Sequence, residues 1–380
     1  MRVAVIHEWL VDYSGSERTL EQILLAYPQA DLFALVDFLP KEQTHFLHGR
    51  TAQTSFIQSL PFARKSFRNY LALFPLAVEQ FDLSKYDLVI SNSHSVAKGA
   101  IVGPGQFHVC YCSSPIRYAW DMRHEYLREA GITRGLRYWL AQFILHRLRI
   151  WDAATAHSVD KYIANSKFVA SRIRKFYGRD AVVIHPPVDI ELFTARAEKE
   201  DFYLVASRQV PYKKIHLIVE AFRSMPHRQL VVIGDGPEAS NIAKLAEGYP
   251  NIRLLGYQSS VVLKDYMQRA KAFVFAAKED FGIILLEAQA CGTPVIAYAE
   301  GGALETVIPE GSGQTGMFFD EQSSESIIKA IQEFEAGPAI SSAACRANAE
   351  AYTPQNFRAQ LRGVIETGFE EYRAAASTRR

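Results

Sequence analysis

The 380-residue sequence has little of what several classes of protein require. Its 42 lysine and arginine residues only balance 41 acidic ones, so the net charge of +1 lacks the basic excess of nucleic-acid-binding proteins. No stretch approaches the roughly 18 apolar residues of a membrane-spanning helix. The apolar run after Met1 is too short for a signal peptide. We therefore expect a cytoplasmic protein that binds no nucleic acid and contacts membranes only peripherally.

Cysteine is scarce as well. Cys110 and Cys112 alternate along an apolar run, and the remaining two, Cys291 and Cys345, form no second pair that would complete a zinc site. We expect four free thiols in a reducing compartment.

Short apolar runs alternate with amphipathic segments along the chain, a pattern typical of parallel sheets covered by helices on both faces. The predicted strands are residues 3–6, 32–36, 88–90, 109–112, 162–164, 202–206, 229–233, 252–255, 272–275 and 294–297. Two prolines at 186–187 block both a helix and a central strand. We predict an α/β protein with two doubly wound Rossmann-like domains, 1–185 and 186–354, facing a cleft. An amphipathic helix at about 355–380 returns to the first domain.

The strongest chemical signal follows the predicted strand at 272–275. A loop there holds Glu279, and a helix starts near Gly282. The free amides of this helix start, that of Ile283 among them, suit a diphosphate. Glu287 lies more than one turn inside the helix, within reach of ligand hydroxyls. The two acids would bind a sugar and a ribose; alternatively, they are ordinary acids favoured by the helix dipole.

Two further signals also follow predicted strands. Ser207, Arg208 and Lys213 come after the strand at 202–206, where two cations suit a diphosphate leaving group. The alternative is a solvated basic loop. Gly15 and Ser16 lie after the first strand and before a helix, where small residues let a phosphate or sugar approach the backbone.

Together these segments resemble the retaining glycosyltransferases of family 4. Glu279 and Glu287, with seven residues between them, match the E-x7-E motif of that family. E-x7-E alone is a loose pattern, but the whole set is specific, and the resemblance covers nearly the whole chain. The other segments in the family's order are Arg208…Lys213, Gly234–Pro237 and Gly301–Glu305. The first half resembles the WbaZ-like mannosyltransferases of O-antigen and exopolysaccharide assembly through His7–Leu10, Ser91–Gly99, Ser114–Asp121 and Ala164–Phe168.

The resemblance implies a GT-B fold and a role for each motif. Glu279 would bind hydroxyls of the donor sugar, and Glu287 would hold the donor ribose. Two cations, Arg208 and Lys213, would stabilise the departing nucleoside diphosphate. The sequence contains no Asp-x-Asp, which agrees with chemistry that needs neither metal nor cofactor. The remaining donor-site residues would be Gly15, Ser16, Ser207, Gly234, Gly282 and Ile283.

One departure from the subgroup concerns the reacting-sugar or acceptor side. Relatives often carry histidine where this chain has Ser113, and serine cannot share a proton near neutral pH. Either the rate depends on other groups, or another histidine, His94 or His7, serves instead. Arg117 follows in the same segment.

Basic and aromatic residues are interleaved in two segments of the first half. Residues 117–151 contain seven arginines against three acids, together with several large aromatic residues, and residues 66–81 are similar. This mixture suits an anionic membrane surface or a lipid diphosphate. The alternative is a pair of packed amphipathic helices with a solvated arginine face.

We therefore predict a retaining hexosyltransferase that moves mannose from GDP-mannose to a polyprenyl-diphosphate-linked glycan or a similar acceptor. It would act in surface polysaccharide synthesis, peripherally on the inner face of the cytoplasmic membrane. Two alternatives remain open. One is the same reaction with a UDP-sugar, and the other is a nucleotide-sugar-binding protein with weak catalysis.

Overall fold

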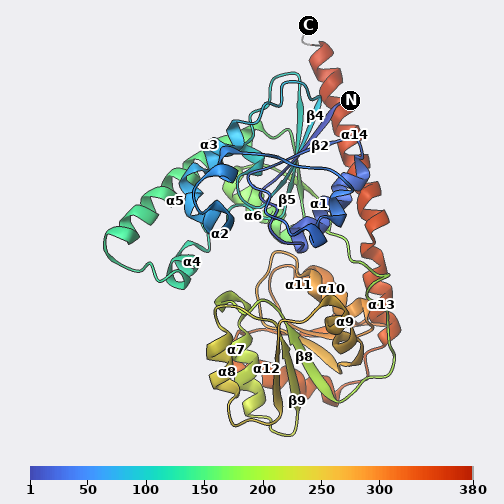
Figure 1. Cartoon of the computed structure of the whole chain (residues 1–380). Helices are drawn as coiled ribbons and strands as arrows, with labels where there is room; N and C mark the ends of the chain where they lie inside the picture. Colours follow the sequence, from blue (N-terminus) through green and yellow to red (C-terminus); the bar gives the residue numbers. More distant parts are fainter. Residues whose placement is uncertain (379–380) are drawn as a thin grey trace. The chain divides into compact units, whose positions relative to one another are not determined.

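The computed structural model describes residues 1–378, so the last two residues of the predicted C-terminal helix lie outside it. The chain forms two compact units (Figure 1). Unit 1 comprises Met1–Pro186 with the C-terminal segment from Gln355 onward, and unit 2 comprises Pro187–Pro354. The division falls between the two consecutive prolines, and each unit has its own core.

Unit 1 is built on a seven-stranded parallel sheet in the order β3-β2-β1-β4-β5-β6-β7. Its strands are β1 Val3–His7, β2 Asp31–Ala34, β3 Gln53–Thr54, β4 Leu88–Ser93, β5 Phe107–Cys112, β6 Lys161–Ala164 and β7 Ala181–Val183. Its α-helices are α1 Gly15–Ala26, α2 Ala63–Ser66, α3 Phe74–Glu79, α4 Arg123–Glu129, α5 Gly135–Thr155, α6 Lys167–Tyr177 and α14 Pro354–Thr378. Apolar residues on both faces of the central strands are buried, as expected for a parallel sheet covered on both sides.

Unit 2 has a six-stranded parallel sheet in the order β10-β9-β8-β11-β12-β13. Its strands are β8 Phe202–Ala206, β9 Gln229–Ile233, β10 Ile252–Gly256, β11 Ala272–Phe275, β12 Val295–Tyr298 and β13 Gly316–Phe319. Its α-helices are α7 Ile215–Arg223, α8 Ala239–Ala246, α9 Ser260–Arg269, α10 Ile283–Ala290, α11 Ala303–Thr306, α12 Ser324–Ala336 and α13 Ser342–Ala349.

The predicted α/β class with two doubly wound sheets is confirmed, and every predicted strand is present within a few residues. Sequence reasoning missed β3, β7 and β13, which are the outermost strands of their sheets. An edge strand pairs on one side only and is less buried, so its apolar run is short and its pattern weak.

The C-terminal helix α14 covers the core of unit 1. Phe357, Leu361 and Ile365 are buried in the same cluster as the apolar face of α1. The Arg362 guanidinium donates to the Ala26 carbonyl at 2.8 Å, which satisfies the C-terminal end of α1. The last part of the chain thus completes the first unit.

The long helix α5 is tied to unit 1 by a buried ion pair. Lys98 Nζ lies 2.9 Å from Asp152 Oδ1, and both side chains are almost fully buried. The indole of Trp120 and the hydroxyl of Tyr177 donate to the same carboxylate. The N-terminal part of α5 extends away from the sheet (Figure 1). No helix within residues 1–378 combines the length and apolar character needed to cross a bilayer.

Candidate functional site

The loops after β8 and β9 in unit 2 are locked together at the carboxyl ends of the strands. The Gln209 N–H donates to the Asp235 carbonyl at 2.8 Å, and the Gln209 side-chain amide donates to the Gly234 carbonyl at 2.9 Å. Gly234 has φ +131°, and a Cβ there would lie 1.9 Å from the Ser207 carbonyl oxygen. Only glycine permits this approach, so Ser207 and Gly234 form one rigid edge.

Lys213 and Glu279 form an ion pair in unit 2, and both side chains are mostly buried. Lys213 ends the short 3₁₀ helix 211–213, and Glu279 lies in the loop after β11. The Lys213 ammonium also lies 5.8 Å from the centre of the Phe275 ring. Arg208 is exposed on the same loop as Lys213. Two residues that are 66 positions apart in the chain (279 − 213) are thus brought together at one edge of the sheet.

The backbone around Glu279 also depends on glycine. The Gly302 N–H donates to the Glu279 carbonyl at 2.8 Å, and Gly301 adopts φ +71° beside it. A Cβ on Gly301 would lie 2.3 Å from the Glu279 carbonyl oxygen. This contact holds the loop in place without using the Glu279 carboxylate.

Helix α10 begins just after this loop. Gly282 caps it with φ +81°, a left-handed conformation that favours glycine, and Ile283 is its first residue. Glu287 lies inside α10 with only 4% of its surface exposed. A carboxylate this deeply buried is costly unless hydrogen-bonding or charged partners compensate it. An acid that is favoured by the helix dipole alone needs no such partners.

In unit 1, the turn before α1 is held by side chains of neighbouring elements. Gly15 is exposed, with nothing within 4 Å of a Cβ placed on it. Asn92 in β4 donates to the Ser16 carbonyl at 3.0 Å. His7, at the end of β1, is buried, and both of its ring nitrogens are bonded, one to Asn92 and one to Glu17.

A buried carboxylate organises the loop after β4. Glu8 is fully buried and accepts hydrogen bonds of 2.7–3.1 Å from the backbone N–H groups of residues 94–97. The Ser93 hydroxyl donates to it at 3.0 Å. His94 is thereby held with its ring edge against Trp9, at a centroid distance of 4.8 Å. Burial lowers the pKa of His94 and outweighs the opposite effect of the Glu8 charge.

Ser113 and Arg117 lie nearby in the segment after β5. The Ser113 N–H donates to the Ser93 carbonyl at 2.8 Å, and its own carbonyl accepts from Asn165 at 3.0 Å. Arg117 is half-buried, and its charge contributes to lowering the pKa of His94. Ser113 therefore neighbours the loop that carries His94, and Arg117 lies within electrostatic reach of it.

Within unit 1, the structure thus gathers Ser16, His7, His94 and Ser113 around the carboxyl ends of β1, β4 and β5. Within unit 2 it pairs Lys213 with Glu279 and joins Ser207 to Gly234. Sequence reasoning missed Glu8, Glu17 and Asn92. Glu17 had a detectable signal, because Ser14 and Glu17 have capping-box spacing and form that motif in the structure.

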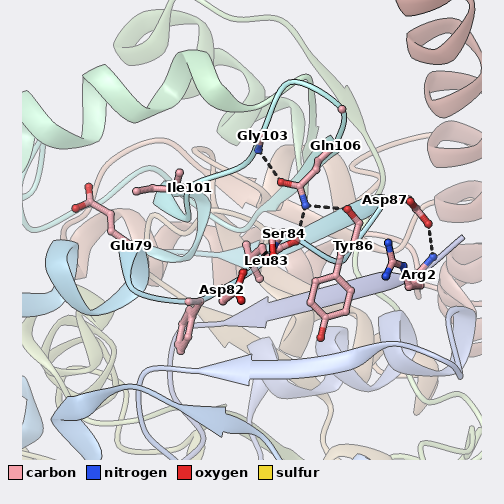
Figure 2. Close-up of a pocket in the computed structure, with 12 residues that line it drawn as sticks. Arg2, Glu79, Asp82, Leu83, Ser84, Tyr86, Asp87, Ile101, Gly103 and Gln106 are labelled. Carbon is pink, nitrogen blue, oxygen red and sulfur yellow. Dashed lines mark hydrogen bonds between the residues drawn. The ribbon is translucent and has the colours of Figure 1, made fainter.

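A separate pocket of about 520 Å³ lies at the opposite edge of the unit 1 sheet. It is lined by residues that precede β1, β4 and β5, among them Arg2, Asp87 and Gln106 (Figure 2). The Gln106 amide is bonded to the carbonyls of Leu83 and Tyr86, so it serves to close the loops. None of the predicted site residues lines this pocket. Among residues 1–378, no three His, Cys, Asp or Glu side chains gather as metal ligands would.

Two family models match nearly the whole chain. Glycosyltransferase Family 4 matches residues 13–192, and Glycosyl transferases group 1 matches residues 190–352. The GDP-mannose-dependent alpha-(1-6)-phosphatidylinositol monomannoside mannosyltransferase of Mycolicibacterium smegmatis is 29% identical over 202 residues, which are 46% of this chain and 52% of that protein. The D-inositol 3-phosphate glycosyltransferase of Geodermatophilus obscurus is 30% identical over 258 residues, which are 60% of this chain and 57% of that protein.

The matched region therefore spans only about half the length of each of these relatives. Among solved structures, Anabaena HepE in complex with UDP superposes with a TM-score of 0.68 at 17% identity, covering 97% of this chain and 100% of that one. At this identity the likeness concerns the fold alone. The fold it shares with this chain is the GT-B arrangement of two Rossmann-like domains.

The edge formed by Ser207 and Gly234 generates a stability prediction. Gly234→Ala should lower the free energy of unfolding of unit 2 by about 1–3 kcal/mol. The new Cβ would collide with the Ser207 carbonyl oxygen, and residue 234 has a backbone conformation that is disfavoured for alanine. Exchange protection of the β8 and β9 amides measures it. All four tryptophans lie in unit 1, so the fluorescence transition should change little. The control is Gly313→Ala, whose Cβ meets nothing. Equal protection in both variants would contradict the assignment.

Proposed function

The chain belongs to the family 4 glycosyltransferases of the GT-B fold, and on that premise we propose that it transfers a hexose from a nucleotide-diphospho-sugar with retention of configuration. The observation that carries the proposal is the Lys213–Glu279 ion pair at the strand ends of unit 2, beside the glycine-capped start of α10. It places a cation and a carboxylate together where ligands of open parallel sheets bind.

The proposed chemistry follows from these charges. The bond between the anomeric carbon and the diphosphate oxygen breaks, and negative charge grows on the leaving diphosphate. The acceptor hydroxyl oxygen bonds to the anomeric carbon, and its proton passes to the departing diphosphate oxygen. Lys213 and the exposed Arg208 would neutralise this charge. A diphosphate that attracts the Lys213 ammonium would free Glu279 to accept hydrogen bonds from sugar hydroxyls.

The other proposed contacts to the donor rest on separate observations. Glu287 is buried on α10 and would bind the ribose hydroxyls. Ser207 and Gly234, with the helix start at Gly282 and Ile283, would line the phosphates. Gly15 and Ser16 of unit 1 would bind donor phosphate, as the family resemblance implies. The two cations supply the charge that a divalent ion supplies elsewhere, so we propose that no metal is required.

The donor we propose is GDP-mannose, which is the donor named for the Mycolicibacterium relative. A UDP-sugar is the second candidate, because the Anabaena structure was solved with UDP. The third candidate is a nucleotide-sugar-binding protein with weak catalysis. It is favoured by Ser113, which stands where the family resemblance implies a histidine.

We further propose a polyprenyl-diphosphate-linked glycan or a similar acceptor, reached at an anionic membrane surface on the cytoplasmic side. The support is the outer face of α5, where Leu136, Trp139 and Phe143 are 85%, 70% and 61% exposed. The exposed Arg134, Arg137 and Arg147 flank these apolar side chains. Apolar residues beside arginines suit the headgroup region of anionic lipid.

Donor identity can be tested with a thermal-shift panel of GDP-mannose, UDP-glucose, UDP-N-acetylglucosamine and the free diphosphates. The true nucleotide should raise the melting temperature most, because it binds only the native state. Glu287→Ala should weaken binding by roughly 1.5–3 kcal/mol. The exposed Glu325→Ala is the matched control and should bind normally. If Glu287→Ala is folded and binds with wild-type affinity, Glu287 does not hold the donor.

Turnover should depend on the two cations more than binding does, because leaving-group charge grows toward the transition state. We expect Lys213→Met and Arg208→Met to lower kcat, measured by release of nucleoside diphosphate in the presence of EDTA. Lys244→Met, on the exposed face of α8, should retain wild-type kcat. Wild-type kcat in both site variants, or loss of wild-type activity with EDTA, would overturn the mechanism.

Membrane contact is tested by sedimentation with vesicles. The wild-type protein should sediment with anionic vesicles and less so as salt rises, since each arginine near the surface contributes about 1 kcal/mol. Arg134→Glu, Arg137→Glu and Arg147→Glu together should abolish sedimentation and leave nucleotide binding unchanged. Arg149 is left intact because it donates to the Ala119 carbonyl. Lys175→Glu, exposed on α6, is the control. A wild-type protein that ignores anionic vesicles at low salt refutes the membrane proposal.

A further inference from the structure

A buried chain of hydrogen bonds links three elements of unit 1 to the turn at Gly15–Ser16. Asn92 of β4 is 1% exposed, and its amide nitrogen donates to the Ser16 carbonyl at 3.0 Å. The same nitrogen lies 3.2 Å from Nδ1 of His7 in β1. Nε2 of His7 lies 3.0 Å from Oε1 of Glu17, in the first turn of α1. The turn is therefore tied to the sheet through side chains.

Glu17 anchors the far end of this chain. Its second carboxylate oxygen accepts from the N–H and the hydroxyl of Ser14, the residue that caps α1. Burial alone would raise the pKa of Glu17, but the hydrogen bonds that its carboxylate accepts from His7 and from the hydroxyls around it lower this pKa. Glu17 therefore acts as an ionised acceptor throughout the neutral range.

The geometry fixes where the proton of His7 lies. A carbonyl oxygen can only accept, so the Asn92 side chain must turn its NH2 group toward Ser16. That NH2 group also faces Nδ1 of His7, which must then be the accepting nitrogen. Nδ1 consequently carries no hydrogen, and the hydrogen of the neutral imidazole lies on Nε2, where it is donated to Glu17.

We propose that Asn92, His7 and Glu17 are positioning residues that fix the Gly15–Ser16 turn. The inference rests on the proposed function in one respect: that function assigns the turn to the donor diphosphate. His7 thereby takes a role different from a group on the reacting-sugar side, because both of its nitrogens are occupied inside the unit.

The test compares Asn92→Asp with the wild type in full-length protein. An aspartate carboxylate cannot donate to the Ser16 carbonyl, so the turn loses this hydrogen bond in the variant. We expect the KM for the donor and the Kd for the free nucleoside diphosphate to rise roughly three- to tenfold, the value of one hydrogen bond. We expect kcat to change less. A rise in KM with nearly unchanged kcat is a split that a merely structural role would not cause.

The matched control is His108→Gln. His108 is a buried histidine on the adjacent strand β5, bonded to Ser91 at 2.9 Å, and it does not touch the turn. It should leave the nucleotide Kd and the KM for the donor unchanged. If Asn92→Asp has the same Kd and KM as this control, the positioning role is overturned.

If the wild type binds neither GDP nor UDP, the proposed function is refuted. The positioning role is then tested by a second measurement that needs no ligand. Hydrogen exchange of the amides of residues 15–18 reports on the turn without any ligand. Faster exchange in Asn92→Asp than in His108→Gln supports the positioning role. Equal exchange in the two variants overturns it.

Discussion

Parallel pairing of the strands is the constraint on which the rest of this structure depends. Each sheet is entirely parallel, so every strand ends at the same edge and every following loop begins there. In unit 2 this brings Lys213 and Glu279 together from loops far apart in the chain. In unit 1 it brings the residues after β1 next to those after β4. The chemistry at each edge follows from this convergence, as in other open α/β sheets.

Buried carboxylates stabilise the convergent loops. Four N–H groups of residues 94–97 would be unsatisfied in a dry interior, and the Glu8 carboxylate accepts from all of them. Glu17 does the same for the start of α1 and also bonds His7. A buried charge is costly unless its hydrogen bonds are made, and both carboxylates make several. These acids therefore shape the backbone, whereas Glu279 and Glu287 of unit 2 are the acids we assign to ligand.

Glycines complete the edge in unit 2. Gly234 and Gly301 lie where a side chain would collide with a carbonyl oxygen, so the loops after β8, β9, β11 and β12 can pack backbone to backbone. The backbone that carries Ser207 and Glu279 is thereby fixed independently of any ligand. A fixed backbone is the preorganisation that the proposed stabilisation of a leaving group requires.

The sequence by itself determined the fold class, the positions of the central strands and the two acids of the E-x7-E motif, because apolar periodicity and motif spacing are local properties. Only the tertiary structure decided which hydrogen-bond partner each polar group has. Glu8 and Ser93 are 85 positions apart, as are His7 and Asn92. No local sequence pattern predicts either pair. The tautomer of His7 follows from a carbonyl on another element. Three of the four edge strands, β3, β7 and β13, follow from neighbours that only the folded sheet supplies. Hydrogen-bond partners distant in sequence become visible only when the strands that carry them lie side by side.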